Sequence, residues 1–599
     1  MAIVKQNPNN NILRFLFIIG LPSLLLLLIS CFSSLRKFLG NEPAETAEFP
    51  APECDKTWIR TVLWLAVIAV VAVVAGNYYT YHKTSVLFDE FHEGETLGAA
   101  IDYLKGRVPF RDTIFVHGVF QDPLRSVLAF KIFGKSIASV RTLESLMQIL
   151  SLFLFSASIF FLFRRNIYYS AVALAVLLII MLVNPFHLSF IIITRDVCLW
   201  LFIIVSVLLV SHMRDDAEET SAGGEGRVLF FLFSFIPMLA LVHSVERGFF
   251  LLAASLINGI LIYLFHFHGR DRKALLCHGL GYVAGLLVLG FAIGWAYRDF
   301  FLYNVVIMPK YKGLLDAYLY PFERARYLLP VIFIAAILWF LTIRFVKLMR
   351  SSKMGVIQKL KAFYIRYFIE IVLAMVSVFY FRSPLGRADT IHVKYVSASI
   401  FIAGVYILMK HYLAPMLMRK GWTGAKALGV GASSMLVLFI SLYTPDLNWK
   451  EFYDFPAGTP DEEIVSSDDL EVAAYLKTNL KDDEYFLTMT NEATWYYLVD
   501  KASPTRFQIV WLALPYFFQN EIVEDLNKKN VKLILYENRK IWMKIDGISN
   551  ERRLPILVDY IRREYVPYKK IKNSEIWIRR SALEGKHRDG EFLMPGTVR

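Results

Sequence analysis

Long apolar runs recur along most of this chain, and they constrain its fold more than any other feature. A helix that crosses a membrane needs about 20 mostly apolar residues. Of the 599 residues, 56% are hydrophobic and only 20% are charged, which is too apolar for a soluble enzyme of this size. About twelve runs approach the length of a span, near residues 12–33, 59–76, 139–163, 167–184, 190–211, 228–243, 249–266, 275–296, 328–346, 364–381, 394–410 and 425–443. The sequence therefore predicts a mainly α-helical, polytopic membrane bundle.

The number of full spans has two open alternatives. The pairs of runs around Asn184-Pro185 and around residues 243–247 are compatible with re-entrant segments. The first run ends in Leu28-Ile29-Ser30-Cys31, which resembles a lipoprotein cleavage site. Cleavage there would reverse the sidedness of the loops that follow, against their charges, so we expect a plain first span.

Basic residues give the bundle its predicted orientation. If every run is a span, one side carries Arg164-Arg165, Arg270 to Lys273, the 344–366 loop and Arg419 to Lys426. By the positive-inside rule that side is cytoplasmic. The net charge of +13 follows from this topology, so we do not expect nucleic-acid binding. The outward side then receives residues 77–138, 298–327 and 382–393, together with everything after 444.

From Pro445 onward the chain becomes polar and alternates between helix and strand patterns. Helices are expected at 468–480, 520–529 and 552–564, and strands at 484–489, 531–536 and 575–580. This alternation predicts a transmembrane domain over 1–444 and an outward-facing α/β domain over 445–599. The latter has no glycine motif for a nucleotide, so we interpret it as a docking or acceptor-recognition module.

Carboxylates and histidines crowd residues 88–125, which we call the acidic stretch. In a helical turn Asp89, His92 and Glu93 share one face at i, i+3 and i+4, whereas Glu90 points elsewhere. An Asp with an ordinary pKa of about 3.9 is ionised near neutral pH and can accept a proton from a nucleophile. The alternative is a solvated turn that Asp89 merely caps.

A divalent cation is a second interpretation of the same turn. His92 with Asp89 and Glu93 offers suitable ligand types. The turn lacks the HExxH pattern, and the four cysteines have no metal-site spacing. No metal ligands are therefore assigned, and the cation stays an alternative.

A second polar motif lies in the outward loop 382–393, where Arg387, Asp389 and His392 form R-x-D-x-x-H. A guanidinium suits bidentate contact with phosphate, and His392 can donate to a phosphate oxygen or leaving group. Arg387 alone would equally serve as an interfacial anchor. The preceding outward loop adds further cations at Lys310, Lys312, Arg324 and Arg326. Together these residues predict an anionic ligand.

One further charged pair, Glu246-Arg247, lies at an apolar boundary. Charged groups at such depth are usually paired and functional. A local interaction between the two at a helix break is the alternative.

Several short motifs resemble one known group. They are Asp89-Glu90, the run GRVPFRD at 106–112, His117, Phe133-Gly134, the motif at 387–392, and NEATWYYLVDKASPTRF at 491–507. In these the chain resembles the bacterial GT-C superfamily of integral-membrane glycosyltransferases, which includes protein O-mannosyltransferases and lipid A aminoarabinose transferases. The resemblance implies a helix-bundle fold, a polyprenyl-phosphate sugar donor, and Asp89 as the catalytic base. The local run FHEGE departs from the family pattern and leaves open whether Glu90, His92 or Glu93 shares that role.

The expected function is transfer of a sugar from a polyprenyl-phosphate donor to a lipid, glycan or protein acceptor, with inversion, at the outer face of a bacterial plasma membrane. Catalytic candidates are Asp89, Glu90 and Glu93, and substrate-binding candidates are His92, His117, Lys310, Arg387, Asp389 and His392. A flippase or transporter of lipid-linked oligosaccharide is the alternative, and it would favour charges inside the spans and an internal repeat. An O-antigen ligase or polymerase would instead carry its large outward loop between spans.

Overall fold

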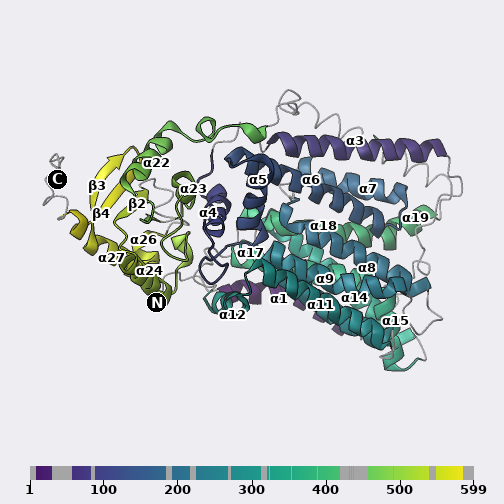
Figure 1. The fold of residues 1–599 in the computed structure, drawn as a ribbon. Coiled ribbons are helices and arrows are strands. Elements are labelled where there is room, and N and C mark those ends of the chain that lie inside the picture. The colour runs from purple at the N-terminus through teal and green to yellow at the C-terminus, as the bar shows by residue number, and fades with distance from the viewer. Residues whose placement is uncertain are drawn as a thin grey trace.

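The computed structural model has two parts, a bundle of long helices and a smaller domain with a β-sheet at one end of it (Figure 1). It describes residues 8–29, 57–81, 88–183, 192–215, 224–266, 271–311, 320–322, 324–351, 354–387, 389–418, 456–489, 491–537 and 548–583, with 431, 433, 434 and 436.

Nine helical segments within the described residues are long and apolar enough to cross a membrane. They lie in α3 (Thr57–Tyr81), α6 (Ile137–Leu162), α8 (Val197–Asp215) with η3 (Thr194–Asp196), α9 (Gly224–His243), α10 (Val245–Phe265), α11 (Arg272–Ala292), α14 (Ala325–Ser351), α16 (Phe368–Tyr380) with α17 (Arg382–Gly386), and α18 (Thr390–Leu408) with η6 (Met409–Leu413) and α19 (Ala414–Met418). Two shorter apolar helical segments are Asn11–Leu21, within α1 (Pro8–Ile29), and Ile167–Met181, which begins with α7 (Ile167–Leu178). The predicted helical bundle is confirmed, and most of the predicted run 425–443 lies outside the described residues, which include only 431, 433, 434 and 436 of it.

Close helix contacts in the bundle rely on small and hydroxyl side chains. Ser234 of α9 donates to the carbonyl of His278 in α11 at 2.7 Å. A Cβ on Gly281 would lie 2.1 Å from Ser234 Oγ, so only glycine allows this approach. Such packing is typical where lipid replaces water and the hydrophobic effect no longer drives helices together.

The C-terminal domain has a four-stranded sheet in the order β1-β2-β4-β3, with β1 and β2 parallel and the other pairs antiparallel. Its strands are β1 (Phe486–Met489), β2 (Leu533–Glu537), β3 (Tyr565–Ile571) and β4 (Ser574–Arg579), and its main helices are α22 (Ser467–Asn479), α23 (Thr494–Val499), α24 (Tyr516–Lys528) and α27 (Pro555–Glu564). The predicted α/β character is confirmed. Strand β3 and helix α23 are additions to the predicted elements.

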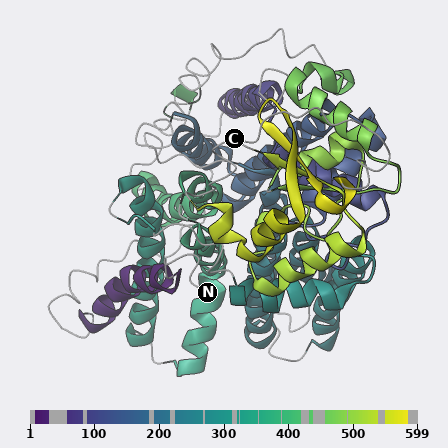
Figure 2. The same ribbon diagram turned by 90° about the vertical axis from the view of Figure 1, so that its left-hand side faces the viewer.

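The acidic stretch does not stand apart from this domain. It folds into α4 (His92–Leu104) and, with the π-helical turn η1 (Phe120–Leu124), leads into α5 (Arg125–Phe133). Leu97 and Ile101 of α4 share one hydrophobic core with Trp495 and Phe507 of the C-terminal domain, and this core also takes in residues of α6, α9, α10 and α11. Most of the spanning helices' buried residues form a second core. The acidic stretch and the C-terminal domain are therefore one packed unit, which covers part of one end of the bundle (Figure 2).

Two glycines make the contact of α4 with the domain possible. A Cβ on Gly94 would lie 2.6 Å from the backbone nitrogen of Thr494, and one on Gly98 would lie 2.6 Å from the carbonyl oxygen of Ala493. No side chain fits at either distance. The backbone of residues 493–494 thus lies directly on the first two turns of α4.

Candidate functional site

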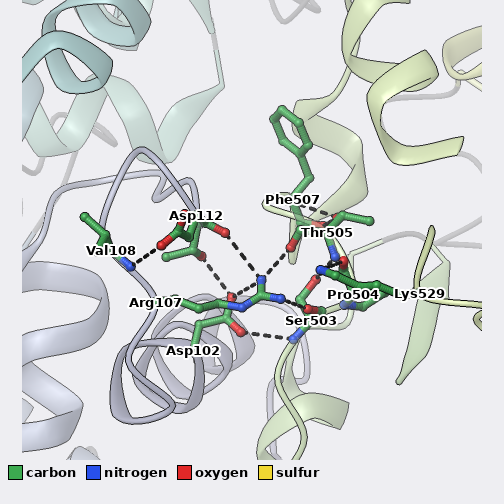
Figure 3. Close-up of polar contacts among 10 residues, drawn as sticks. Asp102, Arg107, Val108, Asp112, Ser503, Pro504, Thr505, Phe507 and Lys529 are labelled. Atoms are coloured by element: carbon green, nitrogen blue, oxygen red, sulfur yellow. Dashed lines mark hydrogen bonds and ion pairs between the residues drawn. The ribbon is translucent and has the colours of Figure 1, made fainter. Parts of the chain in front are cut away.

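The far end of α4 is tied to the C-terminal domain by a buried polar cluster (Figure 3). Asp102, fully buried, accepts from the backbone nitrogen of Ser503 at 3.0 Å and from Thr113 Oγ1 at 2.9 Å. Arg107 donates to the carbonyls of Ser503 and Thr505 and lies 3.6 Å from Asp102. Burial raises the pKa of Asp102. These bonds fix the direction in which α4 presents its first turn.

That first turn carries the predicted catalytic residues. Asp89 Oδ1 accepts from the backbone nitrogens of Phe91 at 3.1 Å and His92 at 3.0 Å, and Oδ2 accepts from His92 Nδ1 at 2.7 Å. The side chains of Asp89 and His92 are 47% and 71% exposed, so both are open to a substrate. Burial opposes ionisation of Asp89, but the hydrogen bonds from His92 outweigh it and lower its pKa. Asp89 is thus both the cap of the turn and an exposed carboxylate.

Glu93 has a different environment. Its two oxygens receive Nε and Nη2 of Arg141 in α6 at 2.6 and 2.8 Å, and one of them also accepts from the backbone nitrogen of Asp89 at 2.9 Å. Arg141 is buried. Because both oxygens of Glu93 are engaged by this bidentate guanidinium, the geometry favours Glu93 as a residue that positions the turn.

The predicted R-x-D-x-x-H loop repeats the arrangement of the first turn. Asp389 caps α18 by accepting from the backbone nitrogen of His392 at 2.9 Å, and it also accepts from His392 Nδ1 at 2.7 Å. Arg387 Nε donates to Asp389 at 3.2 Å, and its guanidinium lies 5.9 Å from the ring centre of Trp511 in the C-terminal domain. Burial opposes ionisation of Asp389, but His392 and Arg387 lower its pKa.

The two motifs meet in space although about 300 residues separate them. The charge of Arg387 is near enough to His92 to oppose, through space, the rise in the pKa of His92 that its hydrogen bond to Asp89 causes. Trp511 brings the C-terminal domain to the same place. The site therefore combines an Asp–His pair, a guanidinium beside a second Asp–His pair, and an indole, all at the end of the helical bundle that the C-terminal domain covers.

A second, more buried group of charges lies behind the first turn. His117 Nδ1 is 3.0 Å from Asp122 Oδ1 and 3.7 Å from Glu95 Oε2, and Asp122 also accepts from the His117 backbone nitrogen at 2.8 Å. Arg195 acts electrostatically on both carboxylates. Burial raises the pKa of Glu95, whereas His117 lowers that of Asp122 against the effect of burial. Carboxyl groups with pKa values shifted in opposite directions are typical of acid–base sites.

Glu246 and Arg247 extend this group into the bundle with separate partners. Ser383 donates to Glu246 at 3.2 Å. Arg247 lies 3.6 Å from Asp196, donates to the carbonyl of Tyr395 at 3.1 Å, and stands over an aromatic ring. Each of the two charges is thus engaged with a different element of the bundle.

Lys310 and Glu90, two further predicted residues, have different surroundings. Lys310, exposed in α13 (Met308–Tyr311), stands over the ring of Tyr311, which contacts Phe517 of the C-terminal domain. Glu90 is buried beneath the turn. Lys312 lies outside the described residues. Among the residues that the structure describes, no group of three His, Cys, Asp or Glu side chains is placed to hold a metal ion, so the divalent cation stays a prediction.

Three residues of the site escaped the sequence reasoning. Arg141 and Arg195 lie inside the predicted spans 139–163 and 190–211, where an isolated arginine is itself a functional signal. The sequence alone therefore marks both arginines as candidates. The sequence around Trp511 carries no such signal, because only the docking of the C-terminal domain brings this residue to Arg387.

No known family model matches the chain, and no curated protein matches it in sequence. Among solved structures, the chain is similar to ArnT from Cupriavidus metallidurans bound to undecaprenyl phosphate, with a TM-score of 0.43 and 10% identity over 88% of this chain and 98% of that one. It is also similar to the archaeal oligosaccharyltransferase AglB from Archaeoglobus fulgidus in complex with an inhibitory peptide and a dolichol-phosphate, with a TM-score of 0.43 and 10% identity over 88% and 74% of the two chains. At this level the similarity concerns the overall arrangement, and the chemistry is argued from the site alone.

Proposed function

We propose that the protein is a membrane glycosyltransferase that moves a sugar from a polyprenyl-phosphate donor to a lipid, glycan or protein acceptor. The observation that carries this proposal is the meeting of the Asp89 turn with Arg387 at one end of a membrane bundle. A proton acceptor beside a cation is the pair of groups that glycosyl transfer from a phosphate needs. A lipid-linked donor would hold its chain between the helices and present its sugar phosphate at that end.

The two motifs divide the reaction between them. The turn at residues 89–93 supplies the base that removes the acceptor's proton. Arg387 and His392 bind the phosphate and stabilise the charge that develops on it as the bond to the anomeric carbon breaks. The base and the leaving group then lie on opposite faces of the sugar, which gives inversion.

The C-terminal domain and the loop charges complete the proposal. Because the domain shares its core with the acidic stretch and places Trp511 at Arg387, an acceptor bound to it would lie next to the site. The basic loops at the other end of the bundle favour a cytoplasmic location for that end. The reaction would then take place on the outer face of a bacterial plasma membrane, with membrane lipid around the spans.

A direct test compares lipid-linked sugars and surface glycans by mass analysis in a deletion strain that carries either the wild-type protein or Asp89→Asn. The variant is expected to accumulate the sugar-charged polyprenyl phosphate and to lose the transferred glycan, with normal membrane insertion. Wild-type glycans in a strain with well-expressed Asp89→Asn would contradict the assignment of this site.

A transporter of lipid-linked sugars is the second candidate, and one cluster favours it. Fully buried Glu370 binds Lys410 at 2.7 Å and His411 at 2.8 Å. Glu370 follows α15 (Val356–Arg366) by four residues, and Lys410 and His411 lie in η6 just before α19. Helices α15 and α19 lie at the end of the bundle away from the C-terminal domain (Figure 1). Charges within spans are typical of transport. Purified protein that moves a labelled lipid-linked sugar across vesicles without transferring it would support this second function instead.

A further inference from the structure

The carboxylate of Asp89 is already engaged by its own turn. It accepts two backbone N–H groups and the imidazole Nδ1–H of His92. Hydrogen bonds to an anion stabilise it and weaken it as a base. A substrate hydroxyl would have to compete with these donors for a lone pair of Asp89.

The imidazole of His92 is the group that faces outward. With Asp89 ionised, Nδ1 must carry the proton, because a carboxylate only accepts. The neutral ring therefore keeps an unprotonated lone pair on Nε2. The side chain is 71% exposed, and the ring of Phe91 lies edge-on to it with the centroids 4.7 Å apart. This ring is held at Nδ1 and open at Nε2.

The charges around His92 come from three places. Asp89 precedes it in the turn, Glu95 follows it on α4, and Arg387 faces it from the loop before α18. The hydrogen bond that His92 donates to Asp89 raises the pKa of His92, while partial burial and Arg387 oppose the rise. A neutral imidazole whose pKa is raised by a carboxylate partner is a stronger base than a free one, which suits general-base work.

We propose that His92 Nε2, and not the carboxylate of Asp89, accepts the proton of the acceptor, with Asp89 fixing the ring and stabilising the imidazolium. This inference rests on the proposed function and specifies its base. The acceptor O–H bond breaks and its proton moves to Nε2, while the oxygen forms a bond to the anomeric carbon. The bond from that carbon to the phosphate oxygen breaks, and its electron pair leaves with the polyprenyl phosphate. His92 then returns its proton to water.

The chain contains a matched control. Asp389 and His392 repeat the D-x-x-H geometry, with the same 2.7 Å contact, on the neighbouring loop that we assign to the phosphate. His92→Gln and His392→Gln therefore remove equivalent rings from equivalent partners. Only the first is expected to remove the proton acceptor.

The test measures kcat and KM against pH for purified wild type, His92→Gln, His392→Gln and Asp89→Asn in lipid nanodiscs. Neutral His92 is the active form, so wild-type kcat should fall as pH drops through a pKa above about 6.5, the ordinary value for His. His92→Gln should lower kcat by about 10²- to 10⁴-fold and abolish this acid limb. His392→Gln should keep the limb and raise the donor KM. Asp89→Asn should lower kcat. The fall of its remaining kcat in acid should move to lower pH, because the imidazole of His92 loses its anionic partner.

A second variant keeps the inference testable if glutamine disturbs the turn. His92→Gly leaves space at an exposed position, and added imidazole should restore part of its kcat. A His92→Gln enzyme that keeps the acid limb, or that changes only KM, would overturn the inference. Wild-type protein with no transfer from any polyprenyl-phosphate sugar would instead overturn the proposed function beneath it.

Discussion

The pair formed by Glu93 and Arg141 offers the sharpest test of how the turn at residues 89–93 is held. Arg141 binds both oxygens of Glu93 at 2.6 and 2.8 Å, and their side chains are 8% and 21% exposed. Removing one partner of a buried ion pair costs about 3–5 kcal/mol because the other charge is left uncompensated. Glu93 keeps some contact with solvent, so Arg141→Met should lower the free energy of unfolding by about 3 kcal/mol.

The double variant separates this explanation from lost packing. Arg141→Met with Glu93→Gln leaves no buried charge, and the glutamine oxygen can still accept from the Asp89 backbone nitrogen. The free energy of unfolding of this double variant should be about 2 kcal/mol higher than that of Arg141→Met alone. The assay is denaturant unfolding in mixed micelles for the wild type, Arg141→Met, Glu93→Gln and the double variant, with sugar transfer measured in parallel. Effects that add within about 0.5 kcal/mol would refute the reasoning, because they would show that the two side chains do not interact.

Two further predictions concern the docking of the C-terminal domain on α4. Arg107→Ala should destabilise this contact by about 3 kcal/mol, because the buried carboxylate of Asp102 would lose its cationic partner. The variant should show a lower thermal midpoint and faster limited proteolysis of the C-terminal domain. An unchanged midpoint would show that the cluster contributes little. Gly98→Ala should cost about 1–3 kcal/mol, because its Cβ would lie 2.6 Å from the Ala493 carbonyl, whereas Gly20→Ala meets nothing within 4 Å and should be nearly neutral. Equal effects of the two glycine variants on thermal unfolding would contradict the close contact.

Most of the fold was predictable because apolar run length and helix–strand alternation are local properties. The helices of the bundle and the sheet character of the C-terminal domain follow from them. Strand β3 was missed because YVPYKKI combines a proline with two lysines, and its pairing with β4 is irregular between Pro567 and Lys569. Helix α23 was missed because its tryptophan and tyrosines favour strands.

The site was predictable only in its separate pieces. The D-x-x-H spacing is local, so the contact of Asp89 with His92 could be expected from the chain alone. The joining of this turn to Arg387 depends on how helices pack, and no local pattern encodes it. The same holds for Asp102 and Ser503, which lie 401 residues apart in sequence. Long-range contacts of this kind are what the structure adds.

The most direct measurement of the central claim uses purified protein in vesicles with a polyprenyl-phosphate donor whose sugar is isotopically labelled. Transfer of the label to an acceptor is followed by NMR, which also reports the configuration at the anomeric carbon. The proposal predicts a transferred sugar of inverted configuration and released polyprenyl phosphate, in a reaction that Asp89→Asn slows strongly. Intact donor that has only changed leaflet, or a product of retained configuration, would contradict it.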